Sequence, residues 1–333
     1  MFAQTADFNQ ILDERRMNLS HKILVSEEIA NEGKQYLIDR GYELKIGRGI
    51  DTQTLIEDLD DCDGIIIRVA PMSEKVISAS KKLKVIAKHG VGVDSIDLEA
   101  AKKYGLRVVN VPNANTNSVA EHAFSLILAC AKKIPFMVKE YKNNNFSIKD
   151  KVHCIEVRGK TLGLIGLGRI GSSVAKMAGI GFDMKVLAYD PYIQKDRVLE
   201  GICLTDSMEE VFRESDFISI HMPANKATTK MIGSREFELM KKSAYIINTA
   251  RGQIIDEIAL IKALEDGEIA GAGLDVSDPE PAKVDNPLFK MDTVIMTPHN
   301  AASTKESLIR MAVGAAMGID EILTNKEPQW PVI

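Results

Sequence analysis

This chain of 333 residues lacks the sequence features of membrane proteins, of nucleic-acid-binding proteins and of secreted proteins held together by disulfides. Its longest apolar run, near residues 124–131, is far shorter than the roughly 20 residues that span a bilayer. The first 16 residues lack the apolar core of a signal peptide. The net charge of −5 comes without a cluster of Lys and Arg, so nothing favours nucleic acid. The four cysteines are scattered without CxxC or metal-ligand spacing, which indicates reduced thiols in the cytoplasm and no metal site.

What the chain does contain is a regular alternation of short strands and helices, over a length that suits about two domains. The strand candidates are Lys22–Val25, Glu43–Ile46, Gly64–Val69, Lys84–Lys88, Arg107–Val111, Leu162–Ile165, Met184–Tyr189, Asp216–His221, Ala244–Ala250, Ala270–Val276 and Thr293–Thr297. The helix candidates include Glu27–Arg40, Thr52–Leu59, Asp97–Tyr104, Asn115–Lys133, Ser172–Ala178, Met208–Arg213, Ser234–Lys241, Asp256–Glu268 and Thr304–Leu323, whereas Tyr141–Val157 is polar and loop-like. This alternation predicts an α/β protein with parallel sheets covered on both faces.

The most specific pattern is Gly166-x-Gly168-x-x-Gly171, directly between a strand candidate and a helix candidate. The first glycine allows a tight turn, the second allows a pyrophosphate to approach the backbone, and the third allows close packing of the helix. The helix N-terminus then offers N–H groups to the phosphates. Asp190 ends the next strand about 20 residues on, where an acidic residue binds the adenosine ribose. Together these features predict a dinucleotide site, although the glycines alone would also fit a plain tight turn.

Reactive side chains follow three later strands, at the sheet edge where a nicotinamide would lie. Arg251 offers a planar fork that matches a carboxylate. His299 titrates near neutral pH and can donate and retrieve a proton, and a carboxylate beside it, such as Glu280, would favour its charged form. Each residue alone has a plainer interpretation, as a surface arginine, a loop carboxylate or the end of a strand. With the dinucleotide motif, the three predict hydride transfer to or from a 2-hydroxy acid.

Six motifs in the same order resemble the D-isomer-specific 2-hydroxyacid dehydrogenase family, near its phosphoglycerate dehydrogenase and hydroxypyruvate–glyoxylate reductase branch. They are His89–Asp97, Gly166–Gly171, Asn248–Gly252, Gly271–Asp275, Pro279–Pro281 and Thr297–Asn300, within a similarity that runs from about Lys22 to Ile333. The resemblance implies an NAD-dependent oxidoreductase acting on the CH–OH group of a small 2-hydroxy acid. It implies two doubly wound parallel-sheet domains, a Rossmann-type cofactor domain (115–303) inserted into a flavodoxin-like substrate domain (22–114 plus 304–333). Residues 1–21 are polar and lack a strong pattern, so they are interpreted as an N-terminal arm or as an upstream start, with Met17 as another possible start.

By motif match, the resemblance also implies roles for individual residues. Arg251 would bind the substrate carboxylate and polarise its carbonyl, and Glu280 and His299 would be the acid/base couple. The cofactor contacts would come from Gly166, Gly168, Arg169, Ile170, Gly171, Asp190, Thr249, Ala250 and Asp275, the last of these at the nicotinamide amide. The substrate carboxylate would meet the backbone of Val91 and Gly92. Arg68 could pair with a substrate phosphate or carboxylate, and a structural ion pair is the alternative.

Some positions depart from the pattern or leave the substrate open. Asn300-Ala-Ala-Ser stands where phosphoglycerate enzymes often have Leu-Gly-Ala-Ser, and Val91 stands where some of them have Thr. Because the sequence ends at Ile333, the regulatory domain of longer relatives and its serine feedback are not expected. The four histidines at 89, 122, 153 and 221 are interpreted as structural.

Partners and cofactor choice complete the expectations. Helix 115–133 is apolar nearly all round, so we expect a homodimer through it, with no nucleic-acid or membrane partner. Asp190 would repel a 2′-phosphate and no Arg follows it directly, so NAD is expected over NADP. The alternative function is a dinucleotide-sensing binding protein, as in corepressors that resemble this family.

Overall fold

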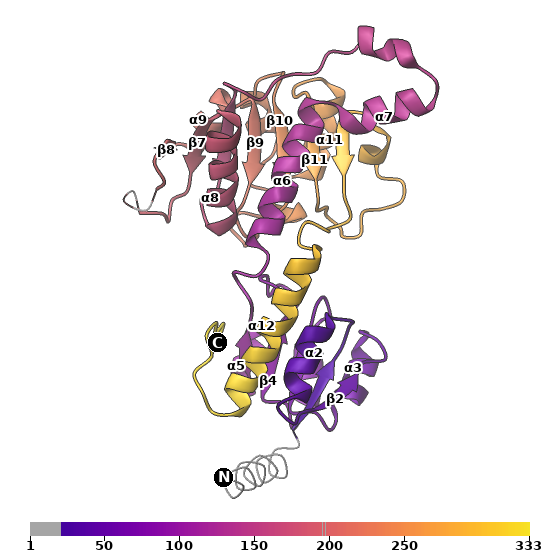
Figure 1. Cartoon of the computed structure of the whole chain (residues 1–333), viewed down its shortest axis with the longest axis vertical. Coiled ribbons are helices and arrows are strands. Elements are labelled where there is room, and N and C mark those ends of the chain that lie inside the picture. The colour runs from indigo at the N-terminus through magenta and orange to yellow at the C-terminus, as the bar shows by residue number, and fades with distance from the viewer. Residues whose placement is uncertain (1–20, 195, 197) are drawn as a thin grey trace, which may run out of the picture. The chain divides into compact units, whose positions relative to one another are not determined.

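The computed structural model describes residues 21–194, 196 and 198–333, so the expected N-terminal arm lies outside the described residues apart from His21. The described chain divides into two compact units. Unit 1 comprises the residues up to Asn115 together with Ser303–Ile333, and unit 2 comprises Thr116–Ala302 (Figure 1). Among the helices of this described part, none has the length and apolar character that crossing a bilayer takes.

Unit 1 is a five-stranded parallel sheet in the order β2-β1-β3-β4-β5, which is the flavodoxin-like order. Its strands are β1 (Lys22–Val25), β2 (Glu43–Ile46), β3 (Gly64–Ile67), β4 (Val85–Lys88) and β5 (Arg107–Val109). Its helices are α2 (Asn31–Ile38), α3 (Thr52–Leu59), α4 (Glu74–Ala79), α5 (Leu98–Lys103) and α12 (Lys305–Leu323). The central strand β3 is buried along its whole length, as expected for a parallel strand with helices on both faces.

The last helix, α12, packs against α2. A Cβ on Gly33 would lie 2.6 Å from the carbonyl oxygen of Ala312, so the two helices touch through backbone and only glycine fits there. The hydroxyl of Tyr42 donates to Asp320 at 2.9 Å and ties the far end of α12 to the sheet. The end of the chain is therefore part of the core of unit 1.

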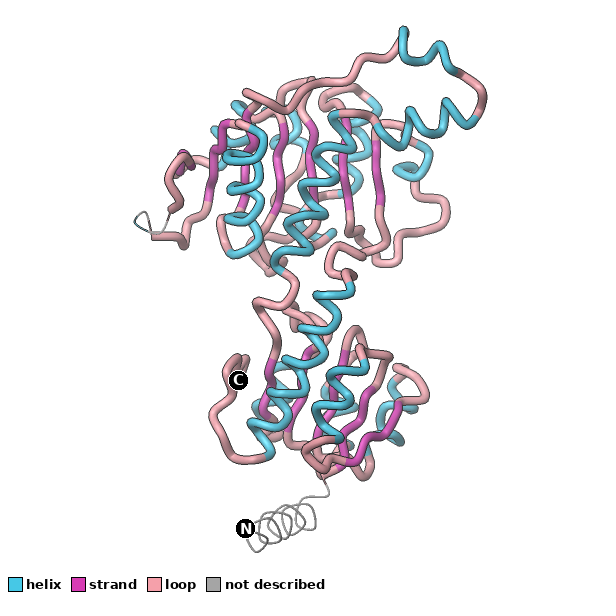
Figure 2. The backbone as a smooth tube through the Cα atoms, viewed as in Figure 1, coloured by secondary structure: helices cyan, strands magenta, loops and turns pink. Residues whose placement is uncertain are grey.

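Unit 2 is a seven-stranded parallel sheet in the order β12-β11-β10-β9-β6-β7-β8 (Figure 2). Its strands are β6 (Thr161–Ile165), β7 (Lys185–Tyr189), β8 (Ile202–Thr205), β9 (Phe217–Ile220), β10 (Tyr245–Asn248), β11 (Gly271–Leu274) and β12 (Val294–Met296). Its helices are α6 (Thr116–Ala131), α7 (Ile134–Lys142), α8 (Arg169–Lys176), α9 (Met208–Glu214), α10 (Ser234–Leu239) and α11 (Glu257–Glu265), with short helical turns η1 (Phe146–Asp150), η2 (Met177–Gly181), η4 (Gly252–Ile254) and η5 (Pro287–Lys290). Counted from β6, this is the Rossmann order 3-2-1-4-5-6 with one more strand at the edge. The expected fold class, α/β with two doubly wound parallel sheets, is confirmed.

Helix α6 lies beside α8 on one face of this sheet (Figure 1). Its apolar residues, including Ala123, Phe124 and Ile127, are buried in the core of unit 2. The apolar surface from which we expected a dimer contact is thus largely used within the chain itself.

The structure corrects several element assignments. Helix α2 begins at Asn31 rather than Glu27, because the carboxylate of Glu27 accepts hydrogen bonds from the backbone beyond β3 and holds the preceding segment outside the helix. Strand β8 was missed because it is an edge strand with partly exposed side chains and no buried run. Helices α4 and α7 were also missed, and α7 buries none of its residues, so it carries no core pattern.

Candidate active site

The glycine turn between β6 and α8 requires glycine at two of its three positions by direct steric contact. Gly166 has φ +97°, and a Cβ there would lie 2.6 Å from the carbonyl oxygen of His221. A Cβ on Gly171 would lie 2.2 Å from the carbonyl oxygen of Gly166. At Gly168 a Cβ would meet nothing within 4 Å. Folding thus demands glycine at 166 and 171, whereas position 168 faces open space, as close approach of a ligand requires.

The surroundings of this turn fit a dinucleotide. Helix α8 begins at Arg169 with Gly168 as its N-cap, and no side chain caps it, so the first N–H groups are free for phosphates. The carboxylate of Asp190 accepts from the backbone N–H of Leu167 at 2.8 Å and of Tyr192 at 2.9 Å, which fixes the turn to the end of β7. The hydroxyl of Thr249, also expected at the cofactor, is buried and has no hydrogen-bond partner among the described residues.

The loop after β10 is built around the buried side chain of Asn248, which the sequence places in a motif without a role of its own. Its amide donates to the carbonyl of Arg251 at 2.8 Å and accepts from the N–H of Ala250 at 3.0 Å. A Cβ on Gly252 would lie 2.0 Å from the carbonyl oxygen of Ser277, so glycine is required where these two loops touch. The backbone that carries Arg251 is therefore fixed from both sides.

His299 and Glu280 are brought together by the loops that follow β12 and β11. The Nδ1 atom of His299 lies 2.6 Å from Oε1 of Glu280. This contact raises the pKa of His299 above its ordinary value of 6.5, while burial and the charge of Arg251 act in the opposite direction. The structure thus gathers the three residues that the sequence proposed for catalysis, with a histidine that is charged more readily than a free one.

Asp275 is the buried centre of a hydrogen-bond network at the same edge, with a fully buried side chain. Its carboxylate accepts from three donors: the hydroxyl of Thr297 at 2.6 Å and the N–H groups of Asn300 at 3.0 Å and Ala301 at 2.8 Å. The Nε2 atom of His122 lies 3.4 Å from the same carboxylate. Burial acts to raise the pKa of Asp275, yet these donors outweigh burial and lower it. Contact with a nicotinamide amide stays a prediction, and it would require this network to open.

Two other histidines are held neutral within the fold. Burial lowers the pKa of His89 to about 4, and burial likewise lowers the pKa of His221 to about 4. His221 also pairs with Ser219 at 2.9 Å, and its carbonyl oxygen packs on the glycine turn. Neither imidazole is suited to exchange protons near neutral pH.

The expected substrate residues of unit 1 follow β3 and β4. Arg68 donates from Nη1 to the carbonyl of Glu28 at 3.2 Å. The N–H groups of residues 68–70 all donate to the carboxylate of Glu27, at 2.8 to 3.1 Å. Gly90, with φ +135°, turns the chain into Val91 and Gly92.

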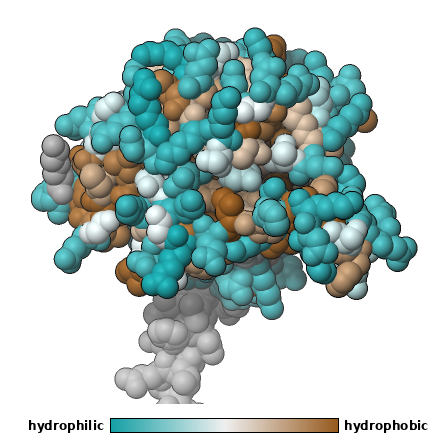
Figure 3. Space-filling model, turned by 90° about the horizontal axis from the view of Figure 1, so that it is seen from above, coloured by the Kyte–Doolittle hydropathy of each residue, from teal (hydrophilic) through white to brown (hydrophobic). Residues whose placement is uncertain are grey.

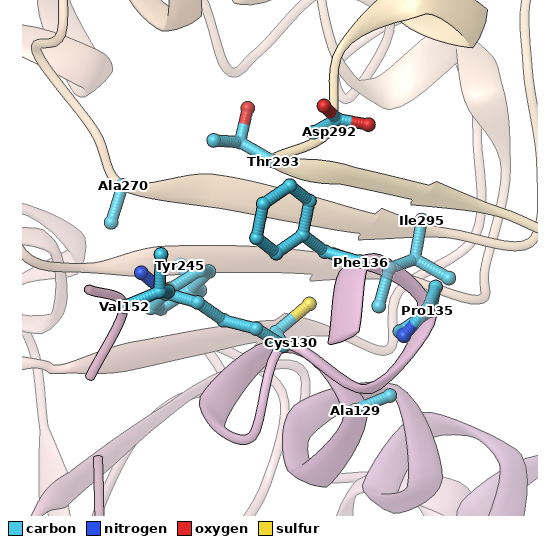
Figure 4. A pocket seen from close by; sticks show the side chains of 11 residues that line it. Ala129, Cys130, Pro135, Phe136, Val152, Tyr245, Ala270, Asp292, Thr293 and Ile295 are labelled. Atoms are coloured by element: carbon cyan, nitrogen blue, oxygen red, sulfur yellow. The ribbon is translucent and has the colours of Figure 1, made fainter. Parts of the chain in front are cut away.

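One pocket of unit 2 lies at the opposite edge of the sheet, where β10, β11 and β12 begin. It measures about 270 Å³, and Figure 4 shows the ring of Phe136 and the sulfur of Cys130 among the groups lining it. Because Tyr245 and Thr293 also line it, the pocket is one strand length away from the site that contains Arg251 and His299. Among the described residues, no group of three or more His, Cys, Asp or Glu could hold a metal ion.

Comparison with known proteins places this geometry in context. The family model described as "D-isomer specific 2-hydroxyacid dehydrogenase, NAD binding domain" matches residues 124–301. The chain is 42% identical over 313 residues to a D-3-phosphoglycerate dehydrogenase of Archaeoglobus fulgidus, covering 93% of this chain and 58% of that protein. It is 35% identical over 298 residues to a glyoxylate reductase of Korarchaeum cryptofilum, covering 87% of this chain and 89% of that protein. The chain thus spans little more than half the length of the phosphoglycerate dehydrogenases that it matches.

A solved structure shares the architecture as well. The D-lactate dehydrogenase of Aquifex aeolicus, complexed with NAD and lactic acid, superimposes with a TM-score of 0.81 at 34% identity. The match covers 92% of this chain and 96% of that one.

Proposed function

The chain belongs to the D-isomer specific 2-hydroxyacid dehydrogenase family, and we propose that it is an NAD-dependent dehydrogenase that interconverts a small 2-hydroxy acid and its 2-oxo acid. The observation that carries the proposal is the 2.6 Å contact between His299 and Glu280, beside Arg251 at the carboxyl edge of the Rossmann sheet. Acid/base chemistry needs a histidine whose protonated form is stabilised, as Glu280 does for His299. Binding of the substrate carboxylate needs a cation such as Arg251.

In this proposal each of the three site residues has a separate role. NADH, when bound, would supply the hydride for C2. Arg251 holds the substrate carboxylate and polarises the carbonyl, while His299 donates a proton from Nε2 to the oxygen that becomes the hydroxyl. Glu280 holds the ring through Nδ1 and stabilises its charged form. In the reverse direction, neutral His299 takes the proton back.

For the cofactor, the residues present fit NAD. The open side of Gly168, the uncapped start of α8 and the unpartnered hydroxyl of Thr249 would receive the pyrophosphate and its neighbouring groups. Asp190 would receive the adenosine ribose, and its negative charge would disfavour the 2′-phosphate of NADP.

Among candidate substrates we place D-3-phosphoglycerate first, because the phosphoglycerate dehydrogenase relative reaches 42% identity. Arg68 in unit 1 is the candidate partner of the phosphate, and the backbone of Val91 and Gly92 is the candidate partner of the carboxylate. Glyoxylate and hydroxypyruvate come second, because a glyoxylate reductase is 35% identical over most of its length.

One assay tests the proposal directly. NADH oxidation is followed with 3-phosphohydroxypyruvate, hydroxypyruvate, glyoxylate, pyruvate, oxaloacetate and 2-oxoglutarate, with His299→Ala as the control. We expect turnover of at least one acid by the wild type and none by the variant. Micromolar binding of NADH without turnover of any acid would instead favour a dinucleotide-sensing protein.

We also propose a homodimer. The apolar residues of α6 are largely buried within the chain, so the support comes from the exposed apolar residues of α7. Ile134, Val138 and Tyr141 lie on one face of α7 and are 48%, 46% and 65% exposed. Helix α7 projects from the body of unit 2 in Figure 2, and its residues Pro135 and Phe136 line the pocket. Figure 3 shows apolar patches on an otherwise polar surface. A second copy is the occupant that would cover this stripe.

Sedimentation tests the dimer. Val138→Asp together with Tyr141→Asp should yield monomers, whereas Tyr192→Asp, at a side chain that is 93% exposed elsewhere, should leave the mass unchanged. A monomeric wild type at micromolar concentration would contradict this proposal. A cytosolic location is proposed as well, supported by four free cysteines.

A further inference from the structure

His122, on helix α6, makes a polar contact that the proposed reaction does not yet use. Its Nε2 atom lies 3.0 Å from Oγ1 of Thr297 and 3.4 Å from Oδ1 of Asp275. Thr297 directly follows β12, and Asp275 directly follows β11. His299 comes two residues after Thr297, and its N–H donates to the carbonyl of Asp275. A helix on the face of the sheet is therefore connected to the loop that carries the acid/base histidine.

The directions of these hydrogen bonds follow from the number of hydrogens available. An ionised carboxylate can only accept, so the 2.6 Å contact between Thr297 and Asp275 uses the single hydroxyl hydrogen of the threonine. The contact between His122 and Thr297 therefore has Nε2–H as its donor. The result is a relay, which we define as His122 to Thr297 to Asp275, with each member donating to the next.

At its far end the relay holds a strained turn. The carboxylate of Asp275 accepts from the N–H groups of Asn300 and Ala301, and the carbonyl of Asp275 accepts from the N–H of His299 at 2.8 Å. His299 has φ +49°, a left-handed conformation that is unfavourable for a residue with a side chain. Such a conformation persists only where the surrounding structure holds it.

We propose that His122 is a positioning residue of the acid/base couple. Its Nε2–H holds the turn at residues 298–301 through the relay, and this turn keeps His299 against Glu280. The inference rests on the proposed function, since it assigns His122 to the proton-transfer step. A residue that merely packed α6 on the sheet would leave the contact between His299 and Glu280 unchanged.

Loss of the donor has a defined consequence. Without His122, the hydroxyl of Thr297 is free to turn from Asp275 toward the carbonyl of Leu274, which lies 3.5 Å away. The turn then loses part of its support and His299 moves away from Glu280. The groups whose charges act on the His299 ring are Glu280, Arg251 and Asp275, and Glu280 is the strongest of them. The pKa of His299 should therefore fall.

Two pairs of variants isolate the relay. His122→Leu removes the donor at similar volume, whereas His122→Gln keeps a side-chain N–H near the position of Nε2. Thr297→Val removes the hydroxyl with its shape conserved, and Thr297→Ser retains it. Ser125→Ala is the control, because Ser125 is exposed on the same helix and its hydroxyl donates to the carbonyl of Glu121 within that helix.

The measurement is the titration of the His299 imidazole by ¹⁵N NMR, with the resonance assigned by its absence in His299→Ala. We expect the His299 pKa to fall by about one unit in His122→Leu and Thr297→Val, and kcat/KM for reduction at pH 7.5 to fall about tenfold. The Gln and Ser variants should recover most of both values, and the control should match the wild type. The Kd for NADH should stay within about twofold throughout.

The outcomes separate this inference from the proposed function. If His122→Leu titrates as the wild type does and reduces substrate equally well, the positioning role is wrong. If the wild type reduces none of the acids while the His299 pKa still falls in His122→Leu, the dehydrogenase assignment fails and the relay stands. If His122→Leu does not fold, equal His299 pKa values in the Val and Ser variants of Thr297 would overturn the relay.

Discussion

Both units turn the chain through a Gly-x-Gly sequence directly after a parallel strand, and they use that turn differently. In unit 2, Gly166 and Gly168 lead at once into α8, whose first N–H groups point along one axis. In unit 1, Gly90 and Gly92 lead into a loop, and the next helix begins only at Leu98. The first arrangement suits the phosphates of a dinucleotide, whereas isolated N–H groups in a loop suit a single carboxylate. The two turns therefore differ in the element that follows the glycines, a helix in unit 2 and a loop in unit 1, and not in the glycines themselves.

The side chains show the same contrast. In unit 2 two of the proposed reactive groups are paired with each other, in the contact of His299 with Glu280. In unit 1, Glu27 occupies the backbone N–H groups after β3, and Arg68, whose Nη1 donates to the carbonyl of Glu28, is the proposed partner of an anion there. We therefore expect unit 2 to determine the chemistry and unit 1 to determine which acid is accepted.

Replacing one arginine from each unit should give the largest difference. Arg251→Met should lower kcat/KM on the order of 10³-fold for every accepted acid, because it removes the group that binds the carboxylate and polarises the carbonyl. Arg68→Met should lower kcat/KM for 3-phosphohydroxypyruvate much more than for glyoxylate. Steady-state kinetics with both acids measure these changes. An equal loss of kcat/KM on both acids in Arg68→Met would contradict the idea that unit 1 determines which acid is accepted.

Alanine at two glycines of the unit 2 turn should separate folding from binding. Gly171→Ala should lower the free energy of unfolding by about 1–3 kcal/mol, because the new Cβ would overlap the carbonyl oxygen of Gly166. Gly168→Ala should leave unfolding within about 0.5 kcal/mol of the wild type, yet weaken NADH binding about tenfold or more. Denaturant unfolding and fluorescence titration measure the two effects. Unchanged NADH affinity in Gly168→Ala would show that the pyrophosphate lies elsewhere.

A smaller effect is expected at Asp190. Asp190→Ala should narrow the preference for NADH over NADPH about tenfold, because the repelling charge and the ribose acceptor are both lost. Asp190→Asn keeps an acceptor for the N–H of Leu167, so it tests the charge with the turn intact. Comparable kcat/KM values for NADPH and NADH in the wild type would overturn the predicted cofactor preference.

The sequence predicted those parts of the fold that depend on local patterns. Most strands end within two residues of the predicted positions, because buried parallel strands read as continuous apolar runs. The same criterion missed β8, an edge strand, and α7, none of whose residues is fully buried. It also extended α2 to Glu27, whose carboxylate is instead used 41 to 43 residues away in sequence.

The candidate site was predictable where a motif names the residue and not where a contact spans the chain. Arg251, Glu280 and His299 follow strand ends, and topology alone places such residues at one edge. His122 was interpreted as structural, because its partner Thr297 lies 175 residues away in sequence. Asn248 was within a motif, yet only the structure shows that its amide holds the loop of Arg251.

The most direct test of the acid/base couple is the pH dependence of both reaction directions in Glu280→Gln. Reduction needs His299 protonated, so its rate falls as pH rises through the His299 pKa; oxidation needs the neutral ring, so its rate rises over the same interval. Because Glu280 raises that pKa, removing its charge should move both limbs to lower pH. Reduction at neutral pH should suffer most. Profiles that overlay those of the wild type would show that Glu280 is only a loop residue and that the assigned couple is wrong.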